Sequence, residues 1–216
     1  MSFSFIMSGV IAISIVFIIC IIAFVKMRDI SLPMKFNMVT NHIKNGNYRS
    51  AVKLCKDIIA KDPKNPEAHY FMGLAYLNDN QNELALDEFR IVDRTGITSK
   101  NINEHELRIH MAELYTKTNK IEEALKEYAL LAQKKANDFE VYFKMGELFD
   151  LKGNKQQAAA YYMKTLQIKK RHVPALYKLG LIYFDFKKYA DAKKLFTLLK
   201  VENPNDWKVY YYLGVI

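Results

Sequence analysis

The chain has 216 residues, of which 50% are apolar and 25% are charged, and its formal net charge is +9. These are the values of a folded globular chain, and they exclude a largely disordered one. The two cysteines, Cys20 and Cys55, belong to no Cys-x-x-Cys pair and no Cys/His cluster, so neither a disulfide framework nor a zinc site is indicated.

The N-terminal segment is strongly apolar. No charged side chain occurs in residues 1–25, and Phe3–Val25 is a nearly continuous apolar run. A helix of that length is about 34 Å long and would cross a hydrocarbon core of about 30 Å. The alternative is a cleaved signal peptide, which would have a basic segment before the run and a small-residue cleavage site after it. Neither is present, so we predict a transmembrane anchor at residues 1–25.

The charges that follow the run predict its orientation. Lys26, Arg28 and Lys35 come after it, and no basic side chain precedes it. Because positive charge is retained on the cytoplasmic side, we predict a single-pass membrane protein with its N-terminus outside and the rest in the cytoplasm. Residues 26–31 are a short juxtamembrane linker. Ser31 and Pro33 then predict the cap and first turn of a helix that opens an array at 32–216.

A spaced pattern of small and aromatic residues recurs along this array. It comprises Leu176, Leu179, Gly180, Tyr183, Ala192, Phe196 and Pro204; 34 residues earlier, Tyr142, Met145, Gly146, Phe149, Ala158 and Tyr162; and, after Pro66, His69, Met72, Gly73, Tyr76, Ala85 and Phe89. Two antiparallel helices approach closely where Gly or Ala removes side-chain bulk, and an aromatic ring fills the adjoining space. The period and the residue order resemble the tetratricopeptide repeat. This resemblance implies an all-α, right-handed superhelical solenoid of antiparallel helix pairs.

The register predicts about five repeats plus the first helix of a sixth. A degenerate first repeat spans 32–65, the second begins at Pro66, the third near His105, and the next two span 139–172 and 173–206. The third starts 39 residues after the second, and the excess of five residues falls in Thr95–Asn103. The sixth unit, Trp207–Ile216, is apolar. Either the chain is a fragment, which we favour, or this uncapped helix self-associates or meets another chain.

In the family that the chain resembles, the first helix of each repeat lines a concave groove, into which repeat positions 2, 5, 9, 12 and 13 point. By register, positions 5, 9 and 12 predict a partner-binding groove lined by Phe36, Tyr70, Leu74, Leu77, Ile109, Glu113, Phe143, Glu147, Asp150, Tyr177, Leu181, Phe184 and Tyr211. Position 13 adds Lys44, Asn78, Lys117, Leu151 and Asp185. The largely aromatic column at position 5 favours a groove that grips an extended or helical peptide. The alternative is that these side chains only pack against neighbouring repeats.

The charged residues point to binding and not to catalysis. Glu113, Glu147, Asp150 and Asp185 predict an acidic patch in the middle of the groove, with no base, nucleophile or metal ligand beside them. We therefore predict that the protein is not an enzyme and has no catalytic residue, cofactor or metal. Lysines on the second helices, such as Lys53 and Lys193, predict a soluble convex face. Contact with anionic lipid is the alternative, and nucleic acid is disfavoured because no arginine-rich motif is present.

These features predict a membrane-anchored scaffold that binds protein or peptide partners in its groove. One alternative is a bacterial envelope-biogenesis regulator, because an N-terminal anchor followed by cytoplasmic repeats resembles the regulators of lipopolysaccharide assembly. Those proteins carry a C-terminal metal module with Cys-x-x-Cys pairs, and this sequence has no such pair. The other alternative is peripheral binding of anionic lipid or nucleic acid through the convex lysines.

Overall fold

The computed structural model describes residues 31–216, and all regular secondary structure in that range is α-helical. The anchor predicted at 1–25 and linker residues 26–30 lie outside the described residues. Within the described range, no helix has the length and apolar character needed to cross a bilayer.

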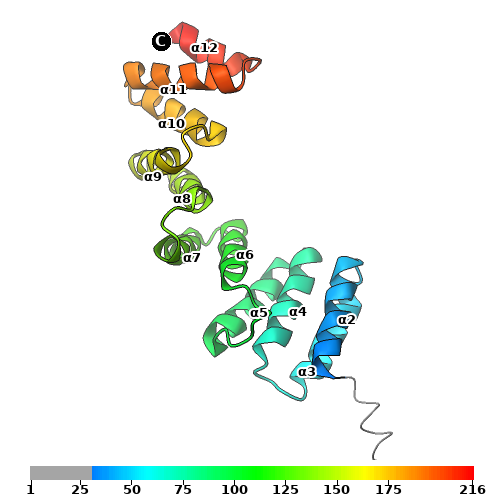
Figure 1. Cartoon of the computed structure of the whole chain (residues 1–216). Helices are drawn as coiled ribbons and strands as arrows, with labels where there is room; N and C mark the ends of the chain where they lie inside the picture. Colours follow the sequence, from blue (N-terminus) through cyan, green and yellow to red (C-terminus); the bar gives the residue numbers. More distant parts are fainter. Residues whose placement is uncertain (1–30) are drawn as a thin grey trace, which may run out of the picture. The chain divides into compact units, whose positions relative to one another are not determined.

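Eleven helices make up residues 31–216 (Figure 1). In chain order they are α2 (Leu32–Lys44), α3 (Tyr48–Ile59), α4 (Pro66–Asn78), α5 (Asn82–Thr95), α6 (Glu104–Lys117), α7 (Ile121–Lys134), α8 (Phe139–Leu151), α9 (Lys155–Ile168), α10 (Val173–Asp185), α11 (Tyr189–Glu202) and α12 (Trp207–Val215). They belong to two compact units. The first unit ends at Thr95 and contains α2–α5, and the second unit, Gly96–Ile216, contains α6–α12.

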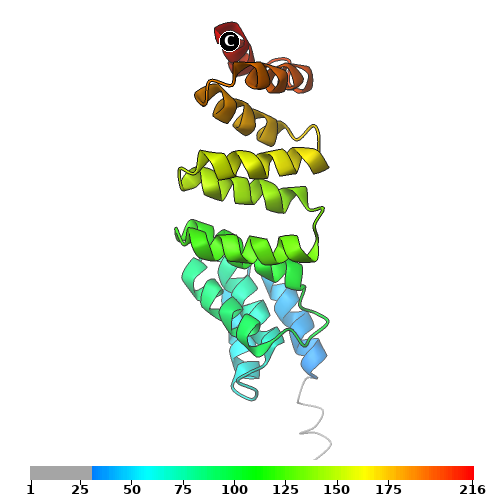
Figure 2. The same cartoon turned by 90° about the vertical axis from the view of Figure 1, so that its left-hand side faces the viewer.

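Consecutive helices pack as antiparallel pairs: α2/α3 and α4/α5 in the first unit, and α6/α7, α8/α9 and α10/α11 in the second. Figure 2 shows α8 and α9 side by side along their length. Within each unit the second helix of one pair also packs on the first helix of the next pair, and α12 packs on α11. The predicted all-α solenoid of helix pairs is therefore confirmed for the described chain.

A glycine at one register position lets the two helices of a pair meet. A Cβ atom at Gly73 would lie 2.5 Å from the Phe89 ring, and one at Gly146 would lie 2.6 Å from the Tyr162 ring. The equivalent atom at Gly180 would be 3.0 Å from its aromatic neighbour. Side chains do not tolerate such approaches in a packed interior, so the spacing of small and aromatic residues in the sequence is a packing requirement.

The turn inside each helix pair passes through a residue with a left-handed backbone. These residues have φ between 58° and 75° and are Gly46, Asn80, Asn119, Gly153 and Lys187. In every turn the N–H of the next residue donates to the carbonyl five residues earlier, as Asn154 does to Phe149 at 2.9 Å. Gly and Asn adopt this conformation readily, whereas lysine adopts it at a cost.

Side-chain caps start several of the first helices. The Asn65 Oδ1 atom accepts from the Ala68 N–H at 2.9 Å, and Asp138 caps α8 through the N–H groups of Glu140 and Val141. Ser31 occupies the cap position of α2 as predicted, but its side chain makes no capping hydrogen bond. The N-terminal end of α2 is thus defined by Pro33 in its first turn and not by a serine cap.

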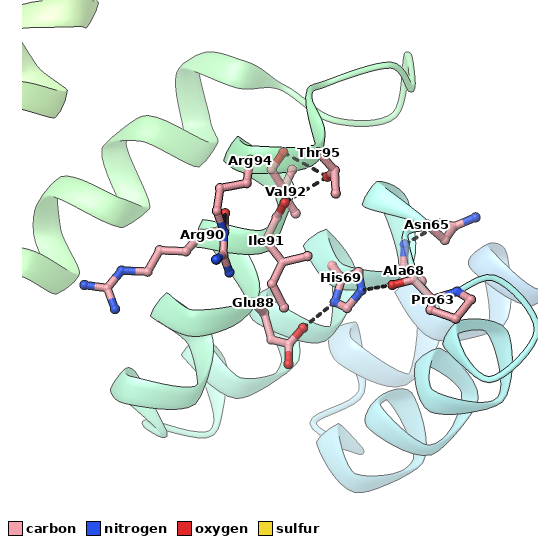
Figure 3. Close-up of polar contacts among 10 residues, drawn as sticks. All are labelled: Pro63, Asn65, Ala68, His69, Glu88, Arg90, Ile91, Val92, Arg94 and Thr95. Carbon is pink, nitrogen blue, oxygen red and sulfur yellow. Dashed lines mark hydrogen bonds and ion pairs between the residues drawn. The ribbon is translucent and has the colours of Figure 1, made fainter.

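A buried polar pair joins the two helices of a repeat in each unit. In the first unit the His69 Nδ1 atom lies 2.6 Å from Glu88 Oε2, and its Nε2 atom lies 3.1 Å from the carbonyl oxygen of Pro63 (Figure 3). In the second unit Arg108 Nη1 donates to Glu127 Oε2 at 2.8 Å. Both pairs link residues 19 apart, so they occupy equivalent places in the repeat. Buried charged groups need such partners, and each pair fixes how its two helices align.

Candidate functional site

Two adjoining pockets lie in the second unit, along the first helices of three successive repeats. The larger has a volume of about 480 Å³ and is lined by residues of α6, α8 and α10 with one residue of α7. The smaller has a volume of about 230 Å³ and is lined by residues of α6, α7 and α8 and by Asp138 and His172, which precede α8 and α10. Glu113, Tyr128 and Lys144 line both pockets. We call the two together the groove.

The structure brings five of the predicted partner-binding residues into this groove: Ile109, Glu113, Phe143, Glu147 and Asp150. Elsewhere in the second unit, three of them are partly buried against the core beneath α11 and α12, namely Tyr177, Leu181 and Phe184. Tyr211 is exposed on α12, and Leu74 and Leu77 are partly buried in the first unit. The predicted residues therefore do not form one uniform surface.

Phe36 and Tyr70 were predicted to face a partner, and the structure corrects that prediction. Their side chains are only 6% and 3% exposed. The Phe71 ring lies 5.6 Å from the ring of Phe36 and 5.6 Å from that of Tyr70, and Phe89 lies behind Tyr70 at 6.1 Å. The alternative reading, packing within the array, holds for these two residues because Phe71 covers them.

Glu113, Glu147 and Asp150 of the predicted acidic patch all line the larger pocket, where lysines neutralise part of their charge. Lys144 Nζ lies 2.9 Å from Glu147 Oε2, and Lys178 Nζ lies 3.1 Å from Asp150 Oδ2. The sequence analysis placed the positive charge on second helices and missed both lysines. They are 34 residues apart and share the sixth position of the repeat, which is a signal that could have revealed them.

Tyr128 reaches the groove from α7, where it lines both pockets. Its side chain is 3% exposed, and its hydroxyl makes no hydrogen bond within residues 31–216. Burial raises the pKa of Tyr128, and the nearby charges of Glu113 and Glu147 raise it further, so the hydroxyl stays protonated at neutral pH. The sequence identified Tyr128 only as a core residue, because its register position is the aromatic position of the second helix.

His172 closes the smaller pocket at the start of α10. Its Nδ1 atom accepts a hydrogen bond from the Ala175 N–H at 3.3 Å, and its ring meets the Phe143 ring edge-on at 4.7 Å. Burial lowers the pKa of His172, and the positive charge of Lys169 lowers it further. The imidazole is therefore neutral at pH 7, as its role as a hydrogen-bond acceptor requires.

The basic residues of the second helices are exposed, and several are engaged. Arg171 Nη1 lies 3.1 Å from Glu202 Oε1, and Lys169 lies over the Phe139 ring at 4.2 Å. Such contacts reduce the free positive charge on that surface. No cluster of three or more His, Cys, Asp or Glu side chains in the described part of the chain is arranged to hold a metal ion.

The described structure defines an all-α solenoid of helix pairs. More particularly, the chain contains tetratricopeptide repeats: sequence profiles of that repeat match residues 42–94, 139–172 and 174–206. These matches confirm the resemblance drawn from the spacing of small and aromatic residues. No curated protein matches the sequence.

Solved structures share the fold. YrrB, described as a TPR protein with an unusual peptide-binding site, is 17% identical with a TM-score of 0.71, over 88% of this chain and 94% of that one. MamA from Desulfovibrio magneticus is 17% identical with a TM-score of 0.65, and the match covers 81% of this chain and 96% of MamA. A tetratricopeptide repeat protein from Parabacteroides merdae is 21% identical with a TM-score of 0.67, and the match covers 84% of this chain and 70% of that protein.

Proposed function

We propose that this protein is a membrane-anchored scaffold that binds a protein or peptide segment in the groove of its second unit. The observation that carries the proposal is the pair of pockets along α6, α8 and α10, which share three lining residues and combine apolar and charged walls. Leu151 lines the larger pocket with 69% of its side chain exposed, which is costly for a leucine unless a partner covers it. The peptide-binding description of YrrB supports the same reading.

The anchor is proposed from the sequence. Phe3–Val25 is long and apolar enough to span a bilayer, and the basic residues after it favour a cytoplasmic array. An anchor would raise the effective concentration of the array for partners at the membrane. Protease treatment of sealed spheroplasts tests the orientation: the array should survive until the membrane is permeabilised. Its digestion in sealed spheroplasts would show that the orientation is reversed.

Photo-crosslinking from inside the groove tests the binding function. A benzoylphenylalanine at position 151 should capture a partner in cells, and mass spectrometry of the adduct would identify it. Val201 on α11 is the matched control, because it is 68% exposed but lines neither groove pocket. Selective adducts at position 151 are expected. Equal adducts at both positions, or none at 151, would contradict the proposal.

Self-association through α12 is a second candidate. Trp207, Tyr211 and Val215 expose apolar surface on that helix, and no atom lies within 4 Å of a Cβ placed at Gly214. Gly214 has the register of Gly180, whose close aromatic neighbour fills the equivalent space. Sedimentation velocity of the detergent-solubilised chain tests this candidate. A dimer that dissociates in the Trp207→Glu/Tyr211→Glu variant is expected, and a concentration-independent monomer in the parent would exclude it.

A further inference from the structure

The carboxylates that line the groove fall into a set paired with lysines and a set exposed to solvent. Glu147 and Asp150 have lysine partners at 2.9 and 3.1 Å. Glu113 lines both pockets and Glu140 lines the smaller one, yet neither carboxylate has an ion pair or hydrogen bond within residues 31–216. The smaller pocket is lined by three carboxylates, those of Glu113, Asp138 and Glu140, and by one lysine, Lys144, so its charge favours a ligand that brings positive charge.

The other polar groups of the smaller pocket do not supply that charge. Lys144 is its only lysine or arginine in the described structure, and its ammonium group faces Glu147. His172 is held neutral and uses Nδ1 to accept from its own helix. His105 turns its Nε2 atom toward Asp138, at 3.4 Å. Lys117, one turn after Glu113 on α6, lines the larger pocket but not the smaller one. A ligand in the smaller pocket that brings a positive group would therefore find Glu113 and Glu140 unpaired.

Tyr128 gives an independent sign of a ligand at the same place. Its side chain is almost fully buried, it lines both pockets, and its hydroxyl has no hydrogen-bond partner. The hydroxyl is not among the buried unpaired atoms, because it opens into the pockets and is solvated there. A ligand that displaces this water has to supply a hydrogen bond in its place. A ligand lying across the two pockets would meet this hydroxyl beside the Glu113 carboxylate.

The larger pocket has a different requirement. Leu148 and the exposed Leu151 form its apolar wall, and three lysines line it. Lys144 and Lys178 are paired with carboxylates, and the third is Lys117. A simple cation or polyamine would satisfy Glu113 but would leave this leucine surface in water. A ligand that matches both pockets carries a positive group and an apolar group on one extended backbone.

We propose that the groove selects an extended peptide segment with a lysine or arginine side chain seated between Glu113 and Glu140, and an apolar side chain seated on Leu151. The peptide backbone crosses Tyr128, whose hydroxyl donates to a peptide carbonyl. This inference rests on the proposed peptide-binding function and adds the chemical class of the partner. The basic side chain supplies selectivity, and the apolar one supplies buried area.

Fluorescence anisotropy of the full chain in mild detergent tests the inference with defined probes. The probes are short fluorescein-labelled Gly/Ser peptides with one lysine and one leucine at varied separation. Matched peptides replace lysine by arginine, norleucine or glutamate, or replace leucine by serine. Lysine and arginine peptides of one separation should bind about tenfold or more tightly than norleucine, glutamate or serine peptides. Spermidine should compete poorly.

Three variants assign the selectivity to the groove. Glu113→Lys should reverse the preference toward the glutamate peptide. Glu123→Lys is the charge-matched control, because Glu123 is exposed on α7 and lines neither pocket, and it should leave the preference unchanged. Tyr128→Phe should weaken binding severalfold without lowering the midpoint of thermal unfolding, since the hydroxyl has no partner inside the protein.

The outcomes separate this inference from the proposed function. Equal binding of lysine, norleucine and glutamate peptides would overturn the basic-residue requirement while leaving peptide binding in place. Tight spermidine binding would replace the peptide by a polyamine. No binding by any peptide, combined with a crosslink at position 151, would overturn the inference alone, and the absence of both signals would overturn the proposed function as well.

Discussion

The two units share one helix-pair register, but the second repeat, in the first unit, and the fourth and fifth repeats, in the second unit, use the sixth position differently. In the second repeat that position holds Phe71, whose ring packs on Phe36 and Tyr70 and leaves both buried. In the fourth and fifth repeats it holds Lys144 and Lys178, which turn to Glu147 and Asp150. The aromatic residue beside Lys144, Phe143, stays partly exposed in the groove. A repeat register therefore assigns a direction to each side chain, and its neighbours decide whether the side chain is accessible.

The largest expected effect concerns the close packing of a glycine against an aromatic ring, which both units share. Gly73→Leu in the first unit and Gly146→Leu in the second should each lower the free energy of unfolding by about 1–3 kcal/mol or more, because the ring opposite leaves no space for a side chain. Gly214→Leu is the matched control, since nothing lies within 4 Å of that position. Urea unfolding followed by circular dichroism measures all three. Equal stability of the Gly73, Gly146 and Gly214 variants would refute the packing argument.

Exchanging the sixth-position residues tests the comparison directly. Phe71→Lys should destabilise the first unit by about 1–2 kcal/mol, because a partly buried aromatic ring loses its contacts with Phe36 and Tyr70. The control Leu84→Lys, at an exposed position of α5, should cost much less. In the second unit, Lys144→Phe should reduce crosslinking from position 151 by covering the groove. Unchanged hydrogen exchange around Tyr70 in Phe71→Lys would show that Phe71 does not cover it.

A smaller effect distinguishes the turns of the two units. Both left-handed turn residues of the first unit are Gly or Asn, whereas the last turn of the second unit uses Lys187 at φ 58°. Lys187→Gly should stabilise the protein by about 1 kcal/mol, because glycine adopts this backbone without the steric cost that lysine incurs. Lys188→Gly serves as the control, since its φ of −82° is ordinary for lysine. Thermal unfolding should show a rise only for the first variant.

The smallest expected effect concerns reactivity and not stability. Cys55 is fully buried in α3, and burial, followed by the charge of Glu88, raises the pKa of its thiol to about 12. At pH 8 the folded thiol is therefore almost entirely protonated, and it should react with a thiol reagent only when the first unit opens. A Cys20→Ser background isolates Cys55. Rapid labelling without urea would show that α3 is not packed as described.

Much of the fold could be predicted from the sequence, because repeat packing is local. Gly73 and Gly146 face aromatic rings, and the spacing of these small and aromatic residues carried the resemblance to the tetratricopeptide repeat from which helix pairs were predicted. The five extra residues in Thr95–Asn103 were also visible, and the division between the two units falls there, between Thr95 and Gly96. The repeat period does not predict whether the array divides into two compact units at this insertion. That division depends on tertiary contacts between helices, which the spacing of residues along the chain does not specify.

The candidate site was predicted only in part. Register placed Ile109, Glu113, Phe143, Glu147 and Asp150 correctly, because position in a helix fixes the direction of a side chain. It could not show that Phe71 covers Phe36 and Tyr70, or that Lys178 reaches back to Asp150 in the preceding repeat. Those outcomes depend on side chains brought together by packing. By itself the sequence determined the repeat, its register and the apolar N-terminal run; the tertiary structure decided which charges are paired, which rings are covered and where a cavity remains.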